Sequence, residues 1–389
     1  MMHLLLNADL YAPGPLGHRH VLIAGGRIVW IGEDVPALPS GMAATDDLAG
    51  ARVIPGLIDC HAHLTGGGGE AGPETRVPPL PPSGLALGGV TTVVGVLGTD
   101  DTIRTPAELV TTARGLAALG ISAYCYTGGY HVPPATVTGS VRGDLVLIDR
   151  VLGVGEVAIS DHRSSQPTRD ELLRIAADAH VGGLMADKAG IVHLHVGDGE
   201  RGLGPLRDAL AHSELPPSVF HPTHVNRRRA LFDEACAIAR EGVAVDITAF
   251  PVGPDEDAWP ADEALVRYLD AGLPAGLVTV STDAGGCLPV FDADGRVASM
   301  DVGQPAALAG ALRALLARRE PLERVLPAFT SNVARVLRLP LKGRLAVGMD
   351  ADLVVLDGGG GVNDVMAGGR WHVRAGQAEV RGRFEGAPR

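Results

Sequence analysis

The 389-residue chain has few cysteines and lacks a long apolar run. Its four cysteines form no Cys-x-x-Cys pair, and so few in a chain of this length make no disulfide framework. No segment has the ~18 uninterrupted apolar residues of a membrane helix. The Leu run within MMHLLLNADL is too short for a signal peptide. We therefore expect a cytoplasmic protein with no membrane partner.

Positive charge is also scarce. The chain has 33 Lys and Arg residues against 45 Asp and Glu residues, a formal net charge of -12, and no long basic run. This argues against nucleic acid or an anionic membrane as the main partner. Anionic small substrates remain compatible, because a few local arginines can outweigh a distant net charge. Hydrophobic residues make up 46% of the chain, enough for a large core.

The middle of the chain alternates β-rich runs with helical patterns. The eight β-rich runs are residues 53–59, 91–97, 122–128, 156–160, 190–196, 219–225, 244–249 and 278–283. Amphipathic segments such as 106–120 and 228–242 lie between them and end in Gly. Eight βα units over roughly 250 residues favour a TIM-type (β/α)8 barrel. A doubly wound open sheet is the alternative.

The two ends of the chain differ from the middle in their sequence pattern, which is one of short β-rich runs and turns. Residues 1–52 read as short strands and turns, and Gly25-Gly26 separates two β-rich runs as in a hairpin. Residues 341–389 show the same pattern of short β-rich runs. We expect both ends to pair into one small β-sandwich-like domain beside a barrel that comprises residues 53–340.

Polar side chains gather where the predicted strands end. The first run ends in Asp-Cys-His61-Ala-His63, and alternate residues of a strand point to the same side, so both imidazoles can bind one metal. Later runs carry His193 and His195, His221 and His224, and Asp283. A single histidine is more often structural than a ligand. The whole set at the carboxyl face of one barrel predicts a metal-dependent active site.

Several strings resemble a known family. Residues 54–63, IPGLIDCHAH, resemble the first metal motif of the amidohydrolase superfamily, and residues 348–357 resemble its return into the small β-domain. Over nearly the whole chain the sequence is similar to the bacterial isoaspartyl dipeptidase family. The most specific strings are GGGGEAGPETR (66–76), TGGYHVP (127–133), AISDHRS (158–164) and PTHVNR (222–227). The resemblance implies zinc-dependent hydrolysis of the β-aspartyl bond of dipeptides and a higher-order homo-oligomer.

The resemblance also implies how two Zn²⁺ ions are held. His61 and His63 bind one metal, and His195 and His224 bind the other. Asp283 binds the first metal and acts as general base and then as general acid. A metal-bound hydroxide then supplies the nucleophile at neutral pH.

Further residues are implied to contact the dipeptide. Tyr130 polarises the scissile carbonyl. Five residues are implied to bind substrate: Glu70, Thr99, Arg163, Arg227 and Cys287. The glutamate suits an ammonium group, and each arginine matches the fork of a carboxylate. Taken alone, each arginine fits a surface or interstrand salt bridge equally well.

The chain departs from the family at two positions of the expected site, Glu156 and Cys287. Glu156 stands where the family commonly has a carbamylated lysine that bridges the metals. It keeps the single negative charge but is shorter, and Gly153 and Gly155 permit a bulge that brings it inward. No carbamylated lysine is therefore expected, and Lys188 is the nearest alternative. Cys287 replaces a serine of the family, and a thiol is the weaker donor.

Two other functions remain open. One is another amide hydrolase of the superfamily, such as an N-acyl amino acid deacetylase or a cyclic-amide hydrolase. The other is a non-catalytic scaffold on the same fold. Scaffolds of this kind lose metal ligands, and the charged residues implied to bind substrate suit a zwitterionic dipeptide, so both are less favoured.

Overall fold

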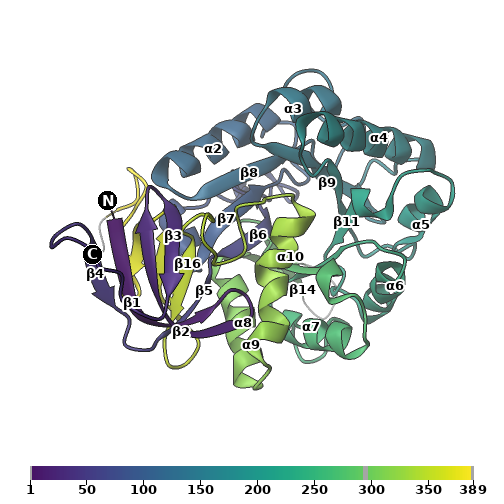
Figure 1. Cartoon of the computed structure of the whole chain (residues 1–389). Coiled ribbons are helices and arrows are strands. Elements are labelled where there is room, and N and C mark those ends of the chain that lie inside the picture. Colours follow the sequence, from purple (N-terminus) through teal and green to yellow (C-terminus); the bar gives the residue numbers. More distant parts are fainter. Residues whose placement is uncertain (1, 292–296, 387–389) are drawn as a thin grey trace.

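Both ends of the chain contribute to one nine-stranded sheet in this computed structural model, which describes residues 2–291 and 297–386. The strand order is β19-β18-β17-β16-β5-β1-β2-β3, with β4 paired to β1. The strands are β1 (Met2–Tyr11), β2 (Pro15–Ala24), β3 (Arg27–Gly32), β4 (Ala44–Asp47), β5 (Arg52–Pro55), β16 (Leu353–Leu356), β17 (Val362–Ala367), β18 (Arg370–Arg374) and β19 (Gln377–Ala378). In Figure 1 the purple and yellow strands lie together on one side of the molecule.

The predicted hairpin is confirmed. Strands β2 and β3 are antiparallel, and Gly25 and Gly26 join them with φ of 58° and 78°. Two positive φ angles in a two-residue turn match the right-handed twist of the flanking strands, and glycine adopts them without steric cost.

The middle of the chain forms a curled parallel sheet (Figure 1). Six strands follow one another as β6 to β11, and β12 pairs with β13. Their bounds are β6 (Leu57–Ala62), β7 (Val90–Gly95), β8 (Ser122–Thr127), β9 (Val151–Ile159), β10 (Ile191–Val196), β11 (Phe220–Thr223), β12 (Val245–Thr248) and β13 (Val278–Ser281). The backbone N–H of Val225 donates to Asp246 O at 3.3 Å, and that of Asp283 donates to His61 O at 3.1 Å. The sequential order excludes the doubly wound alternative, in which the order reverses at a switch point.

Helices lie between these strands and after the last of them. They are α1 (Pro82–Leu87), α2 (Pro106–Leu119), α3 (Val141–Leu147), α4 (Arg169–Ala186), α5 (Gly204–Ala211), α6 (Arg229–Ala239), α7 (Ala261–Asp270), α8 (Ala306–Ala317), α9 (Leu322–Val325) and α10 (Ser331–Val336). A further hairpin joins β14 (Cys287–Phe291) to β15 (Val297–Val302). Helices α2 and α6 occupy the two segments predicted as helical, and Gly120 ends α2 in the left-handed conformation. No helix in the described part of the chain combines the length and hydropathy needed to cross a membrane.

Two predicted strands differ by more than two residues from the observed ones. Residues 53–59 are not one strand, because the chain passes at Gly56 from β5 in the nine-stranded sheet to β6 in the parallel sheet. A Cβ at Gly56 would lie 2.0 Å from Oγ1 of Thr91, so only glycine fits this crossing. The fourth strand begins at Val151 and not at Glu156, which lies inside β9.

The bulge expected near Glu156 is present in β9. Val154 pairs with Val192, but the next pair of the ladder joins Val157 to Leu194, so β9 holds one residue more than β10. A Cβ at Gly155 would lie 2.6 Å from the carbonyl oxygen of His193. Glycine therefore lets the two strands approach closely at the bulge, immediately before Glu156.

Candidate metal centre and active site

Six predicted metal ligands lie at the carboxyl ends of five parallel strands. They are His61, His63, Glu156, His195, His224 and Asp283, carried by β6, β9, β10, β11 and β13 or by the residues just after them. His224 and Asp283 follow their strands with φ of 60° and 53°. This left-handed conformation is uncommon outside glycine and is held where surrounding structure requires it.

The Glu156 carboxylate lies between two pairs of histidines. Its Oε1 is 3.6 Å from Nε2 of His61 and 3.4 Å from Nε2 of His63. Its Oε2 is 3.1 Å from Nδ1 of His195 and 3.5 Å from Nε2 of His224. Two groups of potential ligands therefore share this carboxylate, one with His61 and His63 and the other with His195 and His224.

Asp283 completes one side of the cluster. Its Oδ1 lies 3.0 Å from Nε2 of His63 and 3.4 Å from Nε2 of His61. Within the ranges 2–291 and 297–386, Nε2 of His61 and Oδ1 of Asp283 are buried and make no hydrogen bond. Buried polar atoms normally have a partner. Imidazole nitrogens and carboxylate oxygens are zinc ligands, so the side chains fit a divalent metal.

Electrostatics agree with that fit. Burial lowers the pKa of His61, but the negative charges of Glu156 and Asp283 outweigh burial and raise this pKa to about 9. Burial raises the pKa of Glu156, but the neighbouring histidines outweigh it and hold the pKa well below its usual value. Desolvation likewise raises the pKa of Asp283, but His61 and His63 outweigh it and hold the pKa below its usual value. Both carboxylates thus stay ionised and attract positive charge.

His195 is held from two sides. Its Nδ1 faces the hydroxyl of Tyr130 at 2.8 Å, and its Nε2 faces Oδ2 of Asp161 at 2.9 Å. Asp161 also accepts two hydrogen bonds from the Arg163 side chain, at 3.0 Å to Oδ1 and 2.8 Å to Oδ2. Sequence reasoning missed Asp161, although it lies in the AISDHRS string. Its signal was an acidic residue two positions before an arginine implied to bind substrate.

The predicted substrate-binding residues line one cavity of about 790 Å³, which also contacts five of the six predicted metal ligands. Glu70 accepts hydrogen bonds from Oγ1 of Thr99 at 3.0 Å and from Nη1 of Arg163 at 3.4 Å. The guanidinium of Arg163 lies 5.5 Å from the ring centre of Tyr130. The Glu70 carboxylate and the Arg163 guanidinium thus both line the cavity, where they can contact charged groups of a ligand.

Arg227 and Cys287 complete the wall. Arg227 donates from Nη1 to Val196 O at 2.9 Å and pairs through Nε with Asp198 at 3.1 Å. Sγ of Cys287 lies 3.2 Å from Sδ of Met300. Burial raises the pKa of Cys287, which favours the thiol over the thiolate.

Lys188 lies elsewhere. Its Nζ donates to the carbonyl oxygens of Leu145 and Ile148, both at 2.7 Å. Those residues lie at the end of α3, just before β9 begins, whereas Glu156 lies near the other end of that strand. The lysine thus contacts none of the predicted metal ligands.

Comparison with known proteins agrees with this geometry. The model of the amidohydrolase family matches residues 52–372. A β-aspartyl dipeptidase from Fervidobacterium islandicum AW-1, whose crystal structure is a complex with β-Asp-Leu, is 41% identical in sequence to this chain. The two structures superpose with a TM-score of 0.91. That match covers 99% of this chain and 100% of the other. The imidazolonepropionase of Salinispora tropica is 30% identical over 382 residues, and the match covers 88% of each chain. A D-hydantoinase structure, 18% identical with a TM-score of 0.67, shares the fold.

Proposed function

Because the chain belongs to the amidohydrolase family, we propose that it hydrolyses the β-aspartyl peptide bond of dipeptides on a closed (β/α)8 barrel. The observation that carries the proposal is the 41% identity, over 99% of the chain, to a β-aspartyl dipeptidase whose structure holds β-Asp-Leu. The cavity of this chain presents the charges that such a zwitterion needs.

We propose two Zn²⁺ ions per chain. His61, His63 and Asp283 would hold one and His195 and His224 the other, with Glu156 between them. When bound, the metals supply a hydroxide near neutral pH and polarise the scissile carbonyl. No carbamylated lysine is needed, because a glutamate is already an anion at neutral pH.

Two side chains of this cluster would handle protons. Asp283 would take a proton from the nucleophilic water and return it to the leaving amine, since its Oδ1 is buried and free of hydrogen bonds to the described residues. Tyr130 would donate its hydroxyl proton in a hydrogen bond to the scissile carbonyl oxygen. Burial raises the pKa of Tyr130, so the phenol keeps this proton.

Three charged residues would orient the dipeptide. Glu70 would bind the α-ammonium group, and Arg163 and Arg227 would bind the two carboxylates. The contact of 3.4 Å between Arg163 and Glu70 supports this arrangement, because it keeps each charge compensated before a ligand enters. Thr99 donates to Glu70 and would hold that carboxylate in place.

A hydrolysis screen tests the proposal. Purified protein with added zinc is given β-Asp-Leu and α-Asp-Leu, and free leucine is measured. We expect hydrolysis of the β-linked peptide and much slower hydrolysis of the α-linked one. Equal rates, or hydrolysis of neither peptide, would contradict the proposal.

The similarity to imidazolonepropionases favours hydrolysis of a cyclic amide as a second candidate. The same screen discriminates, since an imidazolone has no α-ammonium for Glu70 to bind. An N-acyl amino acid, tested alongside, covers the deacetylase alternative. Metal analysis covers the scaffold alternative, which predicts that the purified protein binds no zinc.

Some expectations from the sequence remain predictions. They are the cytoplasmic location, the higher-order homo-oligomer, and a small domain of residues 1–52 and 341–389 beside a domain of residues 53–340. Size-exclusion chromatography with light scattering tests the oligomer.

A further inference from the structure

A buried chain of hydrogen bonds begins at His61 and crosses the interior of the curled sheet. Nδ1 of His61 lies 2.8 Å from Nε2 of His193, and Nδ1 of His193 lies 3.1 Å from Nδ1 of His221. Nε2 of His221 lies 3.0 Å from Oγ1 of Thr279, which donates to Oδ1 of Asp246 at 2.5 Å. All five side chains are fully buried, so water does not interrupt the chain.

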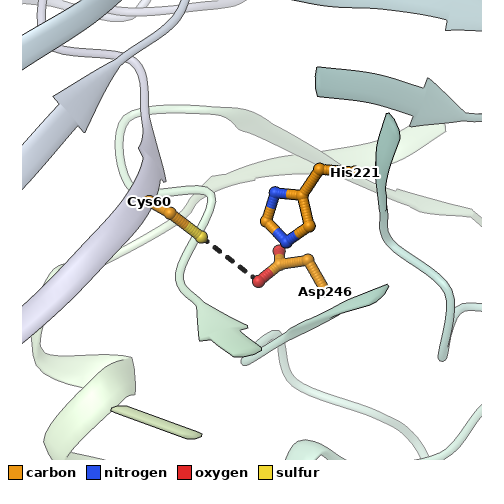
Figure 2. A group of neighbouring side chains, drawn as sticks. All are labelled: Cys60, His221 and Asp246. Carbon is orange, nitrogen blue, oxygen red and sulfur yellow. Dashed lines mark hydrogen bonds between the residues drawn. The ribbon is translucent and has the colours of Figure 1, made fainter. Parts of the chain in front are cut away.

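Asp246 ends the chain as an acceptor. Its Oδ2 accepts from Oγ1 of Thr223 at 2.7 Å and from Oγ of Ser281 at 2.5 Å, and its Oδ1 also accepts from Sγ of Cys60 at 3.3 Å. Figure 2 shows the Cys60 sulfur directed at this carboxylate, with the His221 ring beside it. Burial and the negative charge of Asp246 raise the pKa of Cys60, which therefore stays a thiol donor.

Cys60, His221 and Asp246 also lie close enough together to hold a metal ion. Their polar atoms are already in use, however, because the thiol donates to the carboxylate and Nε2 of His221 is bonded to Thr279. We therefore interpret this group as the end of the hydrogen-bond chain.

The acceptor at one end fixes the direction of every bond. An ionised carboxylate cannot donate, so Thr279 gives its proton to Asp246 and must accept from Nε2 of His221. Nδ1 of His221 then accepts from Nδ1 of His193, whose Nε2 accepts from Nδ1 of His61. Each middle imidazole thus donates from one ring nitrogen and accepts at the other, as a neutral imidazole does.

In the neutral form that metal binding requires, His61 consequently carries its single proton on Nδ1 and keeps a lone pair on Nε2, the atom that faces Glu156 and Asp283. A metal ion binds only the nitrogen that lacks a proton. If the chain ran the other way, Nε2 would carry the proton and could not bind.

We propose that Asp246, acting through Thr279, His221 and His193, is a positioning residue that holds His61 in its metal-binding tautomer. The proposal rests on the metal centre put forward above. It gives a role to four residues that sequence reasoning left without one, on β10, β11, β12 and β13: His193, His221, Asp246 and Thr279.

Three variants of the full chain test it. Thr279→Val keeps the side-chain volume but breaks the link between His221 and Asp246, while Thr279→Ser keeps the hydroxyl. Thr223→Val is the matched control, because it removes a different hydroxyl from the same carboxylate. Zinc dissociation constants come from competition with a chromogenic chelator. We expect a roughly tenfold weaker affinity for Thr279→Val, as for other groups that orient a ligand, and changes under about twofold for the other two.

A spectroscopic measurement reports on the tautomer directly. In Co²⁺-loaded protein, the ligand N–H proton of His61 is a paramagnetically shifted resonance in the NMR spectrum. We expect this proton to exchange slowly with D₂O in the wild type and in Thr279→Ser, and faster in Thr279→Val. Asp246→Asn is the second variant should Thr279→Val not fold. Its amide can donate, so the direction is no longer fixed, and the same loss of affinity is expected.

Unchanged affinity and exchange in Thr279→Val or Asp246→Asn would overturn the proposal. An equal loss in Thr223→Val would overturn it too, because the effect would then belong to the carboxylate and not to the chain. Neither outcome would contradict the proposed function, which is tested by zinc binding and β-Asp-Leu hydrolysis in the wild type. A wild-type protein that binds no zinc would overturn the proposed function as well.

Discussion

Oε1 of Glu156 lies 3.4 Å from Nε2 of His63. The other carboxylate oxygen faces His195 at 3.1 Å, so one side chain serves both halves of the ligand cluster. A shorter side chain than a carbamylated lysine does this because the β9 bulge comes directly before it. The metal centre should therefore depend on the charge of Glu156.

Replacing that charge should weaken zinc binding. Glu156→Gln keeps the size of the side chain but leaves two cations without a shared anion, so we expect at least about tenfold weaker zinc affinity. Glu156→Ala should bind zinc more weakly still. Zinc content after dialysis against a chelator series measures this. Glu234→Gln, which changes a glutamate bonded to Leu203 N outside the cavity, is the control. Wild-type affinity in Glu156→Gln would rule out the bridging role.

Local patterns were sufficient for much of the site. Alternation along a strand placed His61 and His63 on one side, and Gly153 and Gly155 signalled a bulge that the structure contains. The predicted ligands meet because the carboxyl ends of parallel strands share one face.

Contacts across the interior were not predictable in the same way. Asp161 faces His195, and Asp246 ends the chain from His61, only because the curl of the sheet brings distant strands together. The alternation of residues along a strand predicts the side of the sheet to which a side chain points. It does not predict which residue of a distant strand that side chain contacts. The crossing at Gly56 was missed for a similar reason, since a continuous apolar run gives no sign of where it changes sheet.

Arg227 offers a test of substrate recognition. Arg227→Ala should remove a charge-assisted contact to a substrate carboxylate, at a cost of ~2–4 kcal/mol, or about 30- to 1000-fold in kcat/KM for β-Asp-Leu. Arg163→Ala and Glu70→Gln should fall in the same range. Arg229→Ala is the control, because this arginine lies over the ring of Trp259 and not at the cavity. Wild-type kcat/KM in Arg227→Ala would show that the assignment is wrong.

Cys287 should be replaceable. A hydroxyl is a better donor than a thiol, so Cys287→Ser should keep kcat/KM within about threefold of wild type or raise it. Iodoacetamide should react slowly with Cys287, because burial raises its thiol pKa. Loss of all activity in Cys287→Ser, with zinc content unchanged, would point instead to a catalytic thiolate.

Stability should fall in mild acid partly because of His372 on β18. Burial lowers the pKa of His372 to about 4, below the ~6.5 of an unfolded chain. The unfolded state therefore binds more protons between these values, and stability present above pH ~6.5 is lost as the pH falls toward 4. For this group the loss from pH 7 to pH 5 is about 2 kcal/mol.

Urea unfolding of wild type and His372→Leu at both pH values measures that loss. The leucine variant should lose less stability on acidification, and the difference between the two proteins isolates His372 from the other titrating groups. An identical pH dependence in both proteins would mean that His372 titrates alike in the folded and unfolded states.

Assembly of the metal centre should not require carbon dioxide. A lysine must react with it to become a bridging carbamate, whereas Glu156 is already an anion near neutral pH. Metal binding should then depend on deprotonated histidines and on zinc alone. Apo-protein given zinc should regain activity equally well in bicarbonate-free and bicarbonate-rich buffer. Glu156→Lys should be inactive, because its longer side chain is cationic until modified and must fold into a space shaped for a shorter one. Strong stimulation of the wild type by bicarbonate would contradict this account, and Lys188→Ala would then be the variant to examine.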